Sequence, residues 1–202
     1  MNGIWMKGGF VADGERGTLR RADVLVREGR IAAVGNDLPV EGADVLDCEG
    51  MIVTAGFVDA HVHIESSMVL PEAFGDAILP HGTTCAIADP HEVVNVAGGE
   101  GLRTFLDEAA LAPVDLFTVL PSSVPATLLD TNGAGAFTAA AMREFAARPD
   151  VVGLGEVMCY YDVAVTRRAC PPTCWTPTPA PAYGTTTSAP TPKACWSATG
   201  GG

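Results

Sequence analysis

Two histidines separated by one residue, His61 and His63, have the spacing and side-chain type that can bind a metal ion. They follow an apolar run over residues 51–59, which predicts a buried strand, and carboxylates flank them at Asp59 and Glu65. In an extended strand residues two apart point to the same face, so these four side chains share a face if the strand persists. Neutral imidazole suits zinc, iron or manganese. The alternative, two exposed loop histidines without a ligand, stays open on this pattern alone.

The segment His63-Ile64-Glu65 also fits the first half of the zinc nucleobase-deaminase signature, in which the glutamate is a general acid and base. That signature requires Pro-Cys-x-x-Cys further along the chain. The sequence offers Cys170 and Cys174, which have three residues between them and no proline before the first. We therefore exclude this class of zinc site.

Further ionisable residues follow two later apolar runs. Asp89, His91 and Glu92 come directly after residues 83–88, and they are candidate catalytic residues that orient the substrate or support the metal shell. The alternative is that this tetrapeptide, Asp89-Pro90-His91-Glu92, is a helix cap. Glu156 follows Gly153-Leu154-Gly155, where small residues permit close backbone approach, and it is a candidate bridging metal ligand.

The elements that must position these residues alternate between strand and helix. Such alternation indicates βαβ units and a parallel sheet, and in α/β enzymes the chemistry lies at the carboxyl ends of the strands. Each polar group follows a predicted strand. The strands are predicted at 51–59, 83–88, 114–120 and 151–155, and the helices at 71–79, 100–111 and from 139, the last capped by Thr138.

The parts on either side of this segment differ from it. Residues 1–50 predict a small β-sandwich-type segment, in which strands 22–26 and 30–34 are joined through a turn at 27–29. Residues 164–202 are rich in proline and threonine and contain no aspartate or glutamate. We expect this tail to be disordered and unrelated to the fold before it, as a reading-frame error or a misjoined gene end would produce.

Composition narrows the class of partner. The chain of 202 residues is 48% hydrophobic and has a net charge of −12. Proteins that bind nucleic acid through its phosphates present basic surfaces, so nucleic acid is not expected as a partner. No apolar run reaches the roughly 18 residues of a membrane span, and we expect no membrane partner and a cytoplasmic location.

Taken in order, the motifs resemble one family. The segment from Gly56 to His63 is similar to the first-strand motif of the amidohydrolase superfamily, and the later segments are similar to adenine deaminases in particular. The later segments are Ile64-Glu65-Ser66-Ser67-Met68, His81-Gly82-Thr83-Thr84, residues 89–96 (DPHEVVNV), residues 121–126 (PSSVPA) and residues 153–158 (GLGEVM). The resemblance covers residues 8 to 163.

The resemblance implies the first four or so strands of a (β/α)₈ TIM-type barrel over residues 51–163, after the small β segment. It implies hydrolysis of adenine to hypoxanthine and ammonia by metal-activated water, with two divalent metals, manganese or iron. His61 and His63 would bind the more buried metal and Glu156 would bridge the pair. The expected partner is a small-molecule substrate, adenine, and a homodimer is a compatible assembly of the intact enzyme.

The superfamily completes its metal shell with later histidines and an aspartate, but the four histidines of this chain all lie at or before His91. We therefore expect the chain alone to fold poorly and to show little deaminase activity, as a truncated or frameshifted fragment. Two alternatives stay open: another cyclic-amide hydrolase of the superfamily, and a non-catalytic metal-binding remnant.

Overall fold

The computed structural model describes residues 3–127, 129–158 and 196–200. These fall into two compact units. Unit 1 contains the described residues up to Phe57 together with the strand at 196–200, and unit 2 contains the described residues from Val58 to 158.

Unit 1 is built from two four-stranded sheets, with strand orders β5-β4-β1-β6 and β12-β7-β2-β3. Both sheets contribute to one core, in which Met6 and Val24 of the first sheet join Val11 and Val53 of the second. The start of the chain thus forms a small β unit in which two sheets share one core. The strands are β1 (Ile4–Lys7), β2 (Phe10–Asp13), β3 (Thr18–Arg21), β4 (Asp23–Arg27), β5 (Arg30–Gly35), β6 (Asp44–Asp47), β7 (Met51–Ala55) and β12 (Trp196–Gly200).

The predicted hairpin of unit 1 is present. β4 and β5 pair antiparallel, and the turn between them places Glu28 and Gly29 at positive φ. A glycine adopts this conformation without steric cost, which explains its place in the turn.

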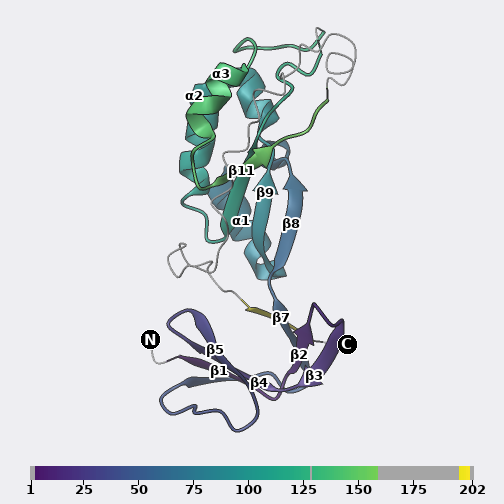
Figure 1. Cartoon of the computed structure of the whole chain (residues 1–202), viewed down its shortest axis with the longest axis vertical. Coiled ribbons are helices and arrows are strands. Elements are labelled where there is room, and N and C mark those ends of the chain that lie inside the picture. The colour runs from purple at the N-terminus through teal and green to yellow at the C-terminus, as the bar shows by residue number, and fades with distance from the viewer. Residues whose placement is uncertain (1–2, 128, 159–195, 201–202) are drawn as a thin grey trace. The chain divides into compact units, whose positions relative to one another are not determined.

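Unit 2 is a four-stranded sheet with helices packed against it (Figure 1). The strand order is β11-β10-β9-β8, and β9, β10 and β11 are parallel. The predicted alternation of strand and helix is therefore confirmed. The elements are β8 (Phe57–Val62), η1 (Ile64–Ser67), α1 (Pro71–Ile78), η2 (Leu79–His81), β9 (Thr83–Ala88), α2 (His91–Ala109), β10 (Asp115–Leu120), α3 (Ala139–Phe145) and β11 (Val151–Leu154).

Local signals explain where several of these elements begin. Pro71 lies in the first turn of α1, where its missing N–H costs nothing. Thr138 caps α3 by accepting a hydrogen bond from the backbone N–H of Ala141. The helices and strands enclose two apolar clusters. One contains Ile64 and Phe105, and the other contains Leu102.

The structure differs from the sequence-based expectation in three places. The single strand expected over 51–59 is two strands, because β7 pairs with β2 in unit 1 whereas β8 joins the sheet of unit 2. The boundary between the units accordingly lies at Phe57 rather than at residue 50. In the predicted tail, residues 164–195 lie outside the described residues, and Trp196–Gly200 form β12, which pairs antiparallel with β7.

Within the described residues, no helix is both long enough and apolar enough to cross a membrane.

Candidate metal centre

The imidazoles of His61 and His63 converge at the end of β8. His61 lies in the strand and His63 is the first residue after it, and their Nε2 atoms are 3.1 Å apart. The rings meet edge to face, with centroids 4.8 Å apart. The expectation that these two side chains share a face is confirmed. It fails for Glu65, because the chain leaves the strand at Val62 and turns into η1.

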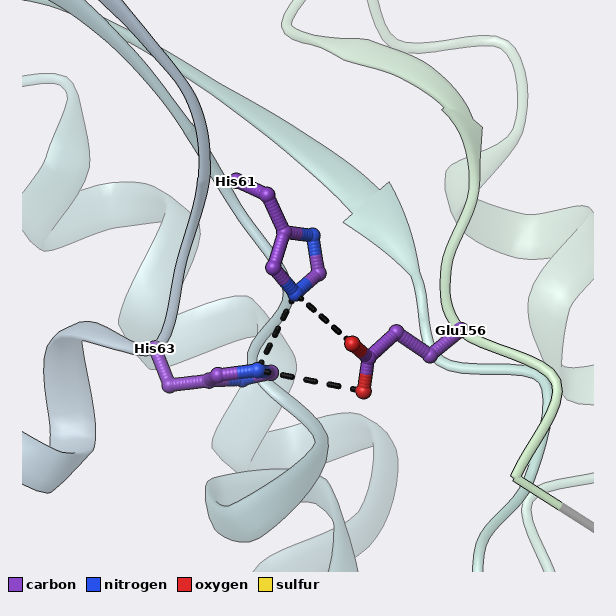
Figure 2. A group of neighbouring side chains, drawn as sticks. All are labelled: His61, His63 and Glu156. Atoms are coloured by element: carbon purple, nitrogen blue, oxygen red, sulfur yellow. Dashed lines mark hydrogen bonds and ion pairs between the residues drawn. The ribbon is translucent and has the colours of Figure 1, made fainter.

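Glu156, which follows β11, reaches the same point from the far edge of the sheet (Figure 2). Its carboxylate oxygens lie 3.1 Å from His61 Nε2 and 3.9 Å from His63 Nε2. Two ligand atoms at about 2.1 Å from one ion are roughly 3.0–3.6 Å apart for ligand angles of 90–120°. The two separations of 3.1 Å lie in this range and the 3.9 Å separation between Glu156 and His63 lies slightly above it, so these three residues, hereafter the strand-end triad, are close enough together to hold a single metal ion.

The protonation of His63 favours this use of its Nε2. Its Nδ1 lies 2.9 Å from the backbone oxygen of Asp89, and a carbonyl oxygen can only accept. A neutral His63 therefore carries its proton on Nδ1, which leaves the lone pair of Nε2 directed toward the strand-end triad. Burial alone would lower the pKa of His63, but the Asp89 carbonyl and the surrounding carboxylates outweigh it and raise the pKa.

Asp89 links the ends of β8 and β11 through hydrogen bonds. It is 1% exposed, and its backbone N–H donates to Val62 at the end of β8. Its Oδ2 accepts a 2.7 Å hydrogen bond from the backbone N–H of Glu156, whereas its buried Oδ1 has no partner. Burial raises the pKa of this carboxyl, and the Glu156 N–H opposes the rise. Asp89 thus positions both His63 and Glu156.

Gly155 makes the approach of Asp89 possible. A Cβ atom on this residue would lie 2.8 Å from Cγ of Asp89, closer than real Cβ contacts allow. Residue 155 must therefore lack a side chain for the bond between Asp89 and Glu156 to form.

A second group lies at the start of α2. Glu92 Oε2 is 3.6 Å from Nε2 of His91 and 3.6 Å from Nδ1 of His63. Glu65 of η1 approaches the same helix turn, where its Oε1 accepts a 3.3 Å hydrogen bond from the backbone N–H of Val93. We refer to Glu65, His91 and Glu92 as the helix-start cluster.

The two carboxyl groups of the helix-start cluster differ in proton affinity. Burial is the largest cause that raises the pKa of Glu65 to about 7, and the nearby Glu92 adds to it. Burial also acts to raise the pKa of Glu92, but its backbone N–H, the Ser66 hydroxyl and the two imidazoles lower it on balance. The hydroxyl of Ser66 donates a 2.9 Å hydrogen bond to Glu92 Oε1. At neutral pH Glu92 is therefore the ionised partner.

The structure brings all six predicted site residues to one end of the sheet of unit 2. His61, His63 and Glu156 converge on one point, and His91 and Glu92 lie beside His63. Asp89 does not act as a side-chain cap, because α2 begins without one. The helix predicted over 100–111 corresponds to the second part of α2, which follows the non-helical residue Gly98 and ends at Ala109, and a further helical segment that was not predicted precedes it from His91.

Sequence reasoning missed two contributors. Ser66 donates a hydrogen bond to Glu92 of α2, 26 residues later in the sequence, and the carboxyl of Glu65 accepts one from Val93, 28 residues later. The flanking position of Glu65 was visible in the sequence, but no local pattern links either residue to the helix that they contact.

Known proteins resemble this chain in sequence. A sequence model of the amidohydrolase family matches residues 52–170. The chain is 44% identical over 161 residues to adenine deaminase 2 of Carboxydothermus hydrogenoformans, covering 80% of this chain and 28% of that protein. It is 43% identical over 141 residues to adenine deaminase of Bacillus subtilis, covering 70% of this chain and 24% of that protein. The chain thus spans about a quarter of the length of these curated relatives.

Solved structures show the same fold at lower sequence similarity. The dihydropyrimidinase of Brevibacillus agri NCHU1002 has a TM-score of 0.56 and 21% identity over 75% of this chain and 32% of that one. A D-hydantoinase from Thermus sp. has a TM-score of 0.52 and 22% identity over 71% of this chain and 31% of that one. With parallel strands, histidines at the end of β8 and a family match over more than half its length, this chain belongs to the amidohydrolase family.

Proposed function

We propose that the protein to which this chain corresponds is an adenine deaminase, which hydrolyses adenine to hypoxanthine and ammonia. The observation that carries the proposal is the convergence of His61, His63 and Glu156 at the strand ends. The similarity to adenine deaminases over most of the chain supports adenine as the substrate. The same superfamily contains enzymes that open cyclic amides, so the bond that is cleaved is the point to test.

The donor set suits a divalent cation. Two neutral imidazoles and a carboxylate can hold zinc, iron or manganese, and the hydrogen bond from His63 to the Asp89 carbonyl keeps one of those imidazoles in the required tautomer. When bound, such an ion lowers the pKa of a water from about 15.7 to near 7 and so supplies a nucleophile at neutral pH. Manganese or iron, a second metal and a homodimer stay predictions of the family resemblance.

The residues of this chain then have separate roles in the proposed reaction. His61 and His63 hold the ion through Nε2, and Glu156 is held against them by Asp89. Water adds to the ring carbon that bears the amino group, and that group must gain a proton before it leaves as ammonia. Glu92 lies within 3.6 Å of two imidazoles and is placed to accept the proton of the water and return it.

The decisive experiment separates ammonia release from ring opening. Residues 1–158 would replace the matching segment of the Bacillus subtilis adenine deaminase, and the purified chimera would be loaded with Mn²⁺. We expect it to convert adenine to hypoxanthine and equimolar ammonia, and to leave dihydrouracil and hydantoin intact. The matched control is the same chimera with His63→Asn. Turnover of a cyclic amide without turnover of adenine would contradict the proposal.

The chain of 202 residues by itself is assayed beside the chimera. It contains no histidine after His91, so the ligands that the family takes from later strands are absent from this sequence. We expect less than a thousandth of the activity of the chimera, measured as ammonia released per chain.

A further inference from the structure

The segment that carries Glu156 leaves the sheet of unit 2 where the pairing of β10 with β11 ends. The two strands pair in parallel up to Leu120 and Leu154, and a 2.7 Å hydrogen bond from the Gly155 N–H to the Leu120 carbonyl follows. The next residue after β10 is Pro121, whose nitrogen has no hydrogen to donate. Glu156 lies beyond the paired residues, so its direction depends on other contacts.

Two serine side chains that directly follow Pro121 supply such contacts. Ser122 Oγ donates a 2.7 Å hydrogen bond to the backbone carbonyl oxygen of Glu156. Ser123 Oγ accepts a 3.1 Å hydrogen bond from the backbone N–H of Met158. These hydroxyls therefore continue, with side chains, the connection that strand pairing makes up to the end of β10.

The backbone of Glu156 is consequently held on both of its polar groups. Its N–H donates to Oδ2 of the buried Asp89 at 2.7 Å, and its carbonyl accepts from Ser122. The Glu156 side chain is 45% exposed, so packing does little to fix its direction. Because the two backbone hydrogen bonds fix the direction of the Cα–Cβ bond, they limit where the carboxylate can lie, and it lies 3.1 Å from His61 Nε2.

The two serines differ in burial. Ser123 is 5% exposed, whereas Ser122 is partly exposed. Loss of a hydrogen bond in a buried position costs folding free energy, so a change at Ser123 would mainly destabilise the chain. Ser122 and Glu156 are both accessible to solvent, so removal of the Ser122 hydroxyl costs less in folding and tests the orientation of Glu156 more directly.

We propose that Ser122 is a positioning residue for the candidate metal centre, which acts through the backbone carbonyl of Glu156 to direct the Glu156 carboxylate toward His61 and His63. Residues that orient metal ligands typically contribute about 10–100-fold to metal affinity. This role accounts for the serine that follows β10, which the proposed reaction leaves without a task. The inference rests on the metal-holding part of the proposed function and is independent of which bond is hydrolysed.

The test measures Mn²⁺ binding to the chain of 202 residues, with free Mn²⁺ followed by its electron paramagnetic resonance signal. Ser122→Ala is expected to weaken binding by about 10-fold, and Ser122→Thr, which keeps the hydroxyl, to bind as the wild type does. Thr127→Ala is the matched control, because it removes a hydroxyl that follows the same strand but donates to Asp130. Far-UV circular dichroism checks that each variant is folded.

A double-mutant cycle shows whether the effect passes through Glu156. If it does, Ser122→Ala should have no further effect on Mn²⁺ affinity once Glu156→Ala has removed the carboxylate. An equal loss of affinity with and without Glu156, in folded variants, would overturn the proposal, because Ser122 would then act by general destabilisation.

Amide hydrogen exchange in the metal-free chain gives a readout without metal. We expect Ser122→Ala to speed exchange of the Glu156 amide by about 3–10-fold, as loss of one neighbouring hydrogen bond would do. The amide of Ala141, which is bonded to Thr138 in α3, should exchange at the same rate in both proteins. Unchanged exchange at Glu156 would overturn the proposal.

The remaining outcomes separate this proposal from that of the reaction. Absence of Mn²⁺ binding by the wild type would overturn the positioning role together with the strand-end triad. Turnover of a cyclic amide by the chimera would contradict the deaminase proposal, whereas the expected Mn²⁺ affinities and exchange rates would still support the role of Ser122.

Discussion

The two units of the molecule use partly or fully buried carboxylates in different ways. In unit 1, Asp23 accepts 2.8 Å hydrogen bonds on both oxygens, from the indole of Trp5 and the backbone N–H of Gly8. In unit 2, Asp89 accepts one from the backbone of Glu156 and has a buried oxygen with no partner.

This contrast extends beyond one pair of residues. Among the described residues, every buried side-chain oxygen without a partner belongs to unit 2: those of Glu65, Asp89, Glu92 and Thr118. The first three cluster where the strands end, and the fourth lies in β10. Because an unsatisfied buried polar atom costs free energy, its persistence at one place points to a role in binding rather than in folding. In this protein the carboxylate with both oxygens hydrogen-bonded, Asp23, has a structural role, whereas the carboxylates with an unpartnered oxygen lie at the candidate site.

The largest expected effect would come from removing a ligand of the strand-end triad. His63→Asn deletes Nε2 from the metal position, and we expect Mn²⁺ affinity at that site to fall by about 100-fold or more, beyond the 10–100-fold typical of supporting residues. Trp5→Phe in unit 1 is the control, because it removes a donor to Asp23 and touches no predicted ligand. Calorimetric titration with Mn²⁺ measures both. Equal Mn²⁺ affinities of His63→Asn and Trp5→Phe would contradict the placement of the metal site in unit 2.

The two aspartates give the most direct test of the contrast. Asp89→Ala removes the acceptor that holds Glu156, and we expect Mn²⁺ affinity to fall by about 10–100-fold. Asp23→Ala leaves the donors of Trp5 and Gly8 unpaired, so it should destabilise unit 1 by about 1–3 kcal/mol without changing Mn²⁺ affinity. Hydrogen exchange of the Gly8 amide and Mn²⁺ titration separate the two effects. An Asp23→Ala variant with weakened metal binding would contradict this division of roles.

Two glycines near the end of β11 provide a matched pair. A Cβ at Gly155 would lie 2.8 Å from Cγ of Asp89, whereas one at Gly153 would meet Val119 at an ordinary 3.6 Å. We expect Gly155→Ala to destabilise the metal-free chain by about 1–2 kcal/mol and to weaken Mn²⁺ binding by about 10-fold. Gly153→Ala should change stability by less than about 0.5 kcal/mol. Thermal melts and Mn²⁺ titration test the pair, and similar behaviour of the two variants would argue against the Asp89 contact.

The smallest expected effect depends on pH. The pKa of Glu65 is raised from 4.5 to about 7, mainly by burial, so its contribution to the stability of the metal-free chain is present below pH 4.5 and is lost as the pH rises through 7. Glu65→Gln cannot ionise. It should match the wild type near pH 4.5 and be more stable at pH 8, by about 1 kcal/mol after allowing for the solvent that reaches this carboxyl.

Thermal unfolding in the presence of a chelator measures this difference. Glu72→Gln, a change of an exposed carboxylate in α1, is the control. A constant difference between wild type and Glu65→Gln from pH 4.5 to 8 would contradict the assignment.

Much of unit 2 could be predicted from the sequence, because its signals are local. β9 occupies residues 83–88 as the apolar run indicated, Thr138 caps α3, and Gly29 turns the hairpin of unit 1. Each of these depends on a few neighbouring residues: their spacing, a cap or a permitted φ. The positions of His61 and His63 on one face followed from the same local geometry.

Other features depended on partners that are distant in the sequence. The run over 51–59 is divided between two sheets because β7 pairs with β2 and β8 pairs with β9. The residues of the run itself do not indicate this division. The kink of α2 at Gly98 likewise coincides with a φ of +61°, and a Cβ there would meet Ala134 of a later loop.

The sequence by itself determined which residues could do chemistry and that they follow strands: two imidazoles at 61 and 63, and carboxylates after the predicted strands at 83–88 and 151–155. Only the tertiary structure decided how they are combined. It brought Glu156 and Asp89, which are 67 residues apart in the sequence, into a hydrogen bond. It also directed Glu65 to the backbone N–H of Val93 rather than to His61 and His63. The physical reason is the separation in sequence over which each effect acts. Backbone preferences act over one or two turns of chain, whereas the convergence of ligands depends on strand pairing and side-chain packing between segments far apart in sequence.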